Sequence, residues 1–365
     1  MTRKPQLQRI SRRGLISSGV LAGVLAATGM QVQARTRGGV LRLGLSGPVT
    51  SWDPRQAQGA FMRVAGQGGV YETLTDLAAS GELVGELAES WEPAANAQIW
   101  TVNLRGGVTF HDGRPVTAPD VAASFALHRT GSPAQAIMDR VAEMRVLNAQ
   151  QIQFQLVGPD ANFPLALSDP HLLVAPEGIF DGIGSGLYRA TDPLGERLRL
   201  ERVPDHHRDG KAGWFDAVIL RAMPDAARRT AALVAGQVDA VDFPADREAI
   251  TGHRSLALWQ DADCGIALFG PPPEALSGVD LVAGPPLAPL VAVDGAYGFG
   301  GTTGPVARYG WGLENLVPAR DGALPQPVAH LPFTMAYTRR LGHEGAIGNL
   351  MALDSGRIAE RWWFA

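Results

Sequence analysis

The sequence predicts an α/β fold from three observations. Several short runs alternate apolar and polar residues, one stretch has the order strand, helix, strand, and a separate stretch combines strand and helix patterns. In the second of these, residues 215–220 and 238–243 are apolar runs joined by a helix that can begin at Asp225 and end before Gly236. Such a unit is typical of a sheet with a crossover helix.

The alternating runs predict strands that bury one face each. Leucines occupy positions 41, 43 and 45 with other residues between them, which predicts a strand at residues 41–45. The same period of two returns at residues 152–156 and 198–203. Trp52-Asp53-Pro54 follows the first run and predicts a turn after it.

The third stretch, residues 100–125, predicts strands followed by a helix. Its alternating pattern is interrupted by Gly106-Gly107 and resumes at residues 108–110, so we expect a tight hairpin at the two glycines. Thr117-Ala-Pro-Asp120 resembles a capping box, and residues 121, 124 and 125 then give a helix one face to bury.

The first 34 residues are predicted to be an export signal rather than part of the fold. Five basic residues precede an uncharged stretch from 14 to 34, and Val32-Gln33-Ala34 fits a cleavage site. The adjacent Arg12 and Arg13 are the twin-arginine pattern. An uncleaved membrane anchor is the alternative. We expect a periplasmic protein whose mature chain begins near Arg35.

Composition excludes several classes of function. Without the signal the chain has 27 basic and 36 acidic side chains, and this negative charge argues against nucleic acid as a partner. Cys264 is the lone cysteine, so an internal disulfide and a cysteine-based metal cluster are both excluded. The mature length predicts two or three domains.

The last third of the chain has a different character. Residues 271–320 contain 9 glycines and 8 prolines, which predicts long loops. The chain closes on the aromatic run Trp362-Trp-Phe364, whose bulk predicts docking onto a core.

Four blocks of sequence carry a family resemblance, and they occur in the family's order. They are YETL at 71–74, LAESWE at 87–92, LRGGVTFHDGRPVTAPDVAASF at 104–125, and GSGLY at 184–188 followed by ALVAGQVD at 232–239. The chain thereby resembles extracellular solute-binding protein family 5, the dipeptide, oligopeptide and nickel-binding proteins of ABC importers. The resemblance spans about residues 38 to 270.

This resemblance implies an α/β fold of the type II periplasmic-binding-protein class, with two lobes and a small inserted α+β domain. Too few residues follow position 270 for a domain-sized second lobe, so we expect that lobe to be shortened. The expected division is a signal at 1–34, a first lobe at 35–70 and 165–270, an inserted subdomain at 71–164, a remnant of the second lobe at 271–330, and a segment returning to the first lobe at 331–365.

The resemblance also implies a function. It predicts a monomer that binds a peptide or similar small solute reversibly, without a cofactor and without catalysis, and delivers it to an ABC permease in the inner membrane. The expected ligand contacts are Ser51, Trp52, Asp53, Gly184, Ser185, Gly186, Tyr188 and Phe269. An indole offers stacking area, and backbone amides near glycines suit a carboxylate. A non-transporting paralogue with an interaction or regulatory role is the main alternative, and a metal-dependent enzyme is a further one.

Three motifs with reactive side chains have simpler structural explanations. Asp112-Gly113 is a turn signal, and neighbouring side chains on a strand point to opposite faces, so His111 and Asp112 are not expected to act together. His206 and His207 are the best metal candidates, but adjacent histidines seldom chelate one ion, and a solvated loop is expected. The glycines at 182–186 lack the P-loop lysine and predict a tight crossing near the ligand cleft.

Overall fold

The computed structural model describes residues 35, 37–56, 59–269, 280–283, 305–308, 326–343 and 352–365. The export signal predicted at 1–34 lies outside this part of the chain, as does most of the Gly- and Pro-rich stretch. Among the residues that are described, no helix has the length and apolar character needed to cross a membrane.

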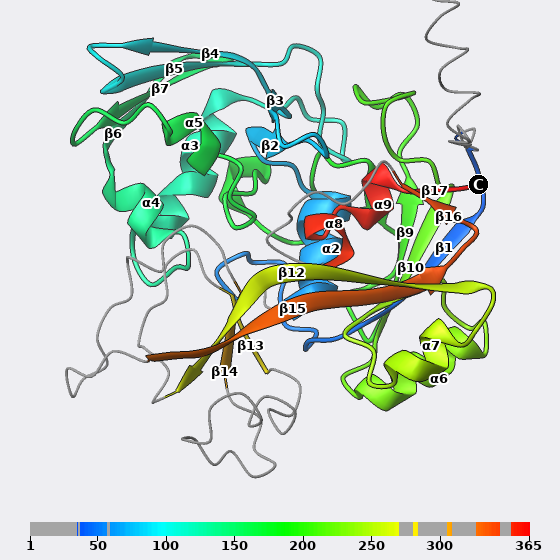
Figure 1. The fold of residues 1–365 in the computed structure, drawn as a ribbon. Helices are drawn as coiled ribbons and strands as arrows, with labels where there is room; N and C mark the ends of the chain where they lie inside the picture. The colour runs from blue at the N-terminus through cyan, green and yellow to red at the C-terminus, as the bar shows by residue number, and fades with distance from the viewer. Residues whose placement is uncertain are drawn as a thin grey trace, which may run out of the picture.

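A large sheet forms the main body of the protein (Figure 1). In the described residues it has nine strands in the order β13-β14-β12-β15-β11-β1-β10-β9-β8. The strands are β1 Val40–Leu45, β8 Tyr188–Ala190, β9 Arg197–Arg202, β10 Ala217–Ala222, β11 Ala240–Asp242, β12 Leu256–Phe269, β13 Asp280–Ala283, β14 Pro305–Arg308 and β15 Gln326–Thr338. Strand β1 is parallel to both neighbours, and the other pairings are antiparallel. The strands predicted at 41–45, 198–203, 215–220 and 238–243 are therefore confirmed to within about two residues.

The predicted strand–helix–strand unit is also confirmed. Helix α6 (Ala226–Val234) connects β10 to β11, which lie on either side of β1, and the Asp225 carboxylate accepts the backbone N–H of Arg228 at 2.8 Å as its N-cap. A short helix, α7 (Arg247–Thr251), follows with Asp246 as its cap.

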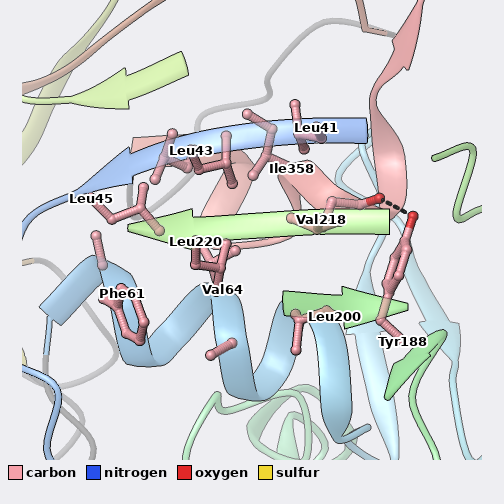
Figure 2. Packing of buried hydrophobic residues seen from close by; sticks show 14 of the residues in the cluster. Leu41, Leu43, Leu45, Phe61, Val64, Tyr188, Leu200, Val218, Leu220 and Ile358 are labelled. Atoms are coloured by element: carbon pink, nitrogen blue, oxygen red, sulfur yellow. Dashed lines mark hydrogen bonds between the residues drawn. The ribbon is translucent and has the colours of Figure 1, made fainter. Parts of the chain in front are cut away.

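The core of the large sheet is built where the leucines of β1 meet helix α2 (Gly59–Ala65) and its continuation, a π-helical turn at Gly66–Val70 (Figure 2). The labelled members are Leu41, Leu43, Leu45, Phe61, Val64, Tyr188, Leu200, Val218, Leu220 and Ile358. All ten side chains are fully buried. Since burying one such side chain contributes about 1.5–3 kcal/mol, this cluster is a main source of the stability of the fold.

A small sheet lies apart from the large one and has its own core (Figure 1). Its strands, in spatial order, are β4 Ala88–Ala94, β5 Ile99–Leu104, β7 Gln151–Leu156 and β6 Val141–Asn148. One face packs against helices α3 (Ala118–Ala126), α4 (Gln135–Asp139) and α5 (Phe163–Ala166). The other face carries polar side chains, which explains the alternation in the sequence.

The hairpin predicted at Gly106-Gly107 is wrong. Strand β5 pairs with β4 and β7, not with the residues that follow it. The tight turn lies further on, where Phe110 donates its N–H to the carbonyl of Arg114 at 2.8 Å. The helix start at Thr117 is confirmed, because the Asp120 carboxylate accepts the Thr117 N–H at 2.9 Å.

Two short hairpins and a C-terminal segment complete the description. Strands β2 (Thr75–Leu77) and β3 (Leu83–Gly85) pair with each other, as do β16 (Leu341–Gly342) and β17 (Trp363–Phe364). Two short helices, α8 (Ala352–Ser355) and α9 (Ile358–Arg361), lie between β16 and β17 in chain order. Trp362 is fully buried, so the predicted docking of the tail is confirmed.

Candidate functional site

The loop after β1 holds the first three predicted ligand contacts and is fixed by an internal ion pair. The Asp53 carboxylate accepts hydrogen bonds from the guanidinium of Arg55 at 2.6–3.1 Å and from its backbone N–H at 2.9 Å. Ser51 Oγ accepts the N–H of Asp53 at 3.1 Å. Burial alone would raise the pKa of Asp53, but the hydrogen bonds from Arg55 outweigh it and lower that pKa. Ser51, Trp52 and Asp53 are all half-buried.

Trp52 belongs to an aromatic group that joins this loop to the glycine-rich stretch. Its ring centroid lies 6.0 Å from that of Tyr71 in an edge arrangement, and Tyr71 lies 5.1 Å from Phe180. Tyr71 Oη accepts the backbone N–H of Gly182 at 2.7 Å. A Cβ atom at Gly182 would lie 2.9 Å from Trp52 Nε1, so the indole requires glycine there. Trp52 and Phe180 keep part of their surface exposed.

The glycine crossing at 184–186 is buried, and its glycines are required by close packing. A Cβ atom at Gly184 would lie 2.0 Å from the carbonyl oxygen of Val70, and one at Gly186 would lie 2.2 Å from that of Gly69. The Gly186 N–H donates to Val70 O at 2.8 Å, so this amide already has a partner. The predicted tight crossing is present, but the Gly186 amide is not free to bind a carboxylate.

The two predicted contacts with hydroxyl groups are also buried. Ser185 Oγ donates to Glu72 Oε2 at 2.8 Å, and Tyr188 Oη donates to the carbonyl of Ala359 at 3.0 Å, the bond drawn in Figure 2. Neither side chain is exposed. Phe269 ends β12, and its side chain lies outside the described residues.

His206 and His207 do not lie in a solvated loop, and that expectation is corrected. Asp205 has a φ of 56°, in the left-handed region, and after this turn both rings face the fully buried carboxylate of Glu72. His207 Nε2 donates to Glu72 Oε1 at 2.7 Å, and His206 Nε2 lies 3.8 Å from the same oxygen. Burial alone would raise the pKa of Glu72, but the hydrogen bond from His207, together with the charge interactions of His207 and His206, outweighs burial and lowers that pKa.

His206 and His111 hold the glycine crossing from two directions. His206 Nε2 donates to the carbonyl of Ser185 at 2.9 Å, and His111 Nε2 donates to that of Gly186 at 2.9 Å. Carbonyl oxygens only accept, so both rings carry a proton on Nε2. Burial lowers the pKa of both histidines. Asp112 faces elsewhere and pairs with Arg114, so His111 and Asp112 do not act together.

Next to Glu72 lies a buried network of ion pairs that sequence reasoning missed. Arg357 is fully buried and contacts Glu86 at 2.6 Å and Glu360 at 2.8 Å. Arg208 contacts the same two carboxylates, at 2.8 and 3.2 Å. Burial opposes ionisation, yet the two arginines lower the pKa of Glu86 to about 2. A signal for this network was present in the sequence. Glu72 lies inside one block of the family resemblance and Glu86 directly before another, and an acidic side chain in a segment that is otherwise expected to be buried needs a charged partner.

Comparison with known proteins finds a family that the chain is similar to. Residues 82–259 match the family model described as "Bacterial extracellular solute-binding proteins, family 5 Middle". The match covers just under half of the chain, which is similar to this family over that range. The chain is 25% identical over 257 residues to a probable peptide ABC transporter periplasmic-binding protein of Sinorhizobium fredii. The aligned residues are 63% of this chain and 48% of that protein. The chain is also 25% identical over 186 residues to the nickel-binding periplasmic protein of Escherichia coli, covering 47% of this chain and 35% of that protein.

Solved structures confirm the fold. The periplasmic binding protein AgaA of A. tumefaciens R10, solved with agropinic acid, matches with a TM-score of 0.58 at 23% identity, over 63% of this chain and 49% of that chain. The chain therefore has the predicted α/β fold of type II periplasmic binding proteins. It spans about half the length of the relatives that it matches.

Proposed function

We propose that this protein is the exported solute-binding component of an ABC importer. It binds a peptide or similar small solute in the periplasm and presents it to a permease of the inner membrane. It acts as a monomer, by reversible binding rather than catalysis, and the twin-arginine pattern at Arg12 and Arg13 directs its export.

The family match over residues 82–259 carries this proposal. Relatives that are 25% identical to this chain over the aligned residues are named as peptide- and nickel-binding periplasmic proteins. The hydrogen bonds of His111 and His206 to backbone carbonyls, and of His207 to Glu72, give these histidines a role in holding the fold around the glycine crossing.

The proposed ligand surface is the half-buried part of the loop after β1. Trp52 and Phe180 offer stacking area there, and the ion pair of Asp53 with Arg55 offers charges of both signs at the same loop. Just before the glycine crossing, the N–H of Gly182 donates to Oη of Tyr71, whose ring contacts Trp52, and this bond helps to hold the surface in place.

Binding is tested with the mature protein purified from a periplasmic extract. Native mass spectrometry identifies a retained solute, and isothermal titration with that solute then gives its affinity. We expect Trp52→Ala to weaken binding at least tenfold, because stacking area is lost. Trp91→Ala, which removes a half-buried indole from the small sheet, serves as the control and leaves the affinity unchanged. Equal affinities of both variants and wild type would contradict the proposed surface.

A non-transporting paralogue is the second candidate, and one observation favours it. Strands β12 and β15 pair directly, and only residues 270–325 separate them, whereas the family resemblance leads us to expect a domain-sized lobe at this point. If purified protein carries no solute and instead retains a second protein through size-exclusion chromatography, the regulatory or interaction role is supported over transport.

A further inference from the structure

Glu72 is a buried carboxylate that has no direct ion pair with an arginine or lysine in the part of the chain that the structure describes. Its neighbour Glu86 has two arginine partners, whereas among the described residues the side chain of Glu72 contacts Ser185, His206 and His207. A buried carboxylate is costly unless a charge compensates it. Either a proton on a histidine or a bound cation meets this need.

The donor atoms around Glu72 are spaced as metal ligands are. One carboxylate oxygen of Glu72 and one ring nitrogen each of His206 and His207 lie within 4.8 Å of one another. Metal–ligand bonds of 2.0–2.1 Å in a tetrahedral site place neighbouring ligand atoms about 3.3 Å apart. The observed separations from Glu72 Oε1, 2.7 Å to His207 and 3.8 Å to His206, lie on either side of that value.

The backbone aims both rings at one point, which adjacent histidines seldom achieve. After the left-handed turn at Asp205 the ring centroids of His206 and His207 lie 4.3 Å apart with an interplanar angle of 34°. The side chain of His207 keeps 14% of its surface exposed, whereas that of Glu72 has none. An ion can therefore approach from the His207 side.

We propose that Glu72, His206 and His207 form a structural site for one divalent transition-metal ion of the zinc or nickel class. A carboxylate with two imidazoles suits such ions rather than magnesium or calcium. The carbonyl oxygen of Ser185, 2.9 Å from His206 Nε2, is available as a fourth ligand. The site joins residue 72, at the start of the small-sheet region, to the loop after β9.

Metal binding has a cost that limits its affinity. Both rings carry their proton on Nε2 without metal, and this proton must move to Nδ1 before Nε2 can bind an ion. In His206, Nδ1 accepts the N–H of Arg208 at 3.2 Å, and binding gives up this hydrogen bond. We therefore expect micromolar rather than picomolar affinity. The site shares no residue with the loop at 51–53, so it stands independently of the proposed function.

Direct metal analysis tests the proposal on the full mature chain without an affinity tag. In equilibrium dialysis against a fixed free concentration of Zn²⁺ or Ni²⁺ above the expected dissociation constant, elemental analysis of both compartments is expected to find one bound ion per chain. His207→Gln and Glu72→Gln are each expected to weaken binding at least tenfold. His253→Gln is the matched control, because within the described residues the ring of His253 bonds locally to Ser255, and the variant is expected to bind the ion as wild type does.

Two results would overturn the site. One is wild-type protein that binds no ion under these conditions. The other is binding that persists at wild-type affinity in both variants, which would assign the ion to another place. If the variants do not fold, two measurements on the wild-type protein still test the site. Added Co²⁺ is expected to absorb strongly in the visible range, as it does in four-coordinate sites of this kind, and added Zn²⁺ is expected to raise the melting temperature. Absence of both effects contradicts the proposal.

Discussion

Acidification is expected to destabilise this protein through His128, which is fully buried. Its Nδ1 lies 2.5 Å from Ser132 Oγ, and its Nε2 is buried with no hydrogen-bond partner among the described residues. Burial, aided by the nearby His171, lowers the pKa of His128 to about 4, against the opposing effect of Asp169. The folded protein therefore keeps this ring neutral at pH values where the unfolded chain protonates it.

The sign and size of the effect follow from the two pKa values. Above pH 6.5 both states are neutral at His128, and the histidine adds no pH dependence. Between pH 6.5 and about 4 the unfolded chain binds a proton at His128 that the folded protein does not bind. The free energy of unfolding therefore decreases as the pH is lowered through this range. At 1.36 kcal/mol per pH unit, the loss at pH 5 is about 2 kcal/mol.

Urea unfolding at pH 7.5 and pH 5.0 measures this loss, in wild type and in His128→Asn. The asparagine amide oxygen lies near the position of Nδ1, and the intrinsic cost of the substitution appears at both pH values and cancels in the difference. Wild type should lose about 2 kcal/mol more than the variant. His111 and His206 add to the loss equally in both proteins, since burial lowers their pKa values as well.

The carboxylates do not obscure the comparison. Glu86, with its pKa lowered to about 2, contributes stability that is present above pH 4.5 and is lost as the pH falls further, outside the measured window. If wild type and His128→Asn lose the same free energy between pH 7.5 and 5.0, the burial argument for His128 is refuted.

Two further predictions concern the packing of the core. Gly184→Ala places a Cβ atom 2.0 Å from a backbone oxygen and should lower the free energy of unfolding by about 3 kcal/mol or more, the upper range for overpacking. Gly158→Ala, which has open space around it, should change that free energy by less than about 0.5 kcal/mol. Arg357→Leu leaves Glu86 buried without its closest partner and should cost about 3–5 kcal/mol. Arg145→Ala, which breaks an exposed ion pair, should cost under about 1 kcal/mol. Urea unfolding at pH 7.5 checks all four, and equal effects of the buried and exposed substitutions would contradict the reasoning.

Prediction from sequence succeeded where a local pattern determines the structure. The leucines of β1 and the Asp225 cap of α6 were predicted correctly, because a strand period and a helix cap involve residues close together in the chain. It failed at Gly106-Gly107, because the partner of strand β5 is chosen by packing of the whole small sheet and not by the next turn.

The sequence by itself therefore determined the family resemblance, the fold class and four of the nine strands described in the large sheet. Only the tertiary structure decided what the reactive residues contact. Glu72 meets His207 across 135 positions, and Glu86 meets Arg357 across 271. Such contacts bring together segments that are distant in the chain and leave no local period or spacing to detect. The glycine crossing, predicted as a ligand contact, proved buried for the same reason, since the backbone that packs against it, at residues 69 and 70, lies more than a hundred positions earlier.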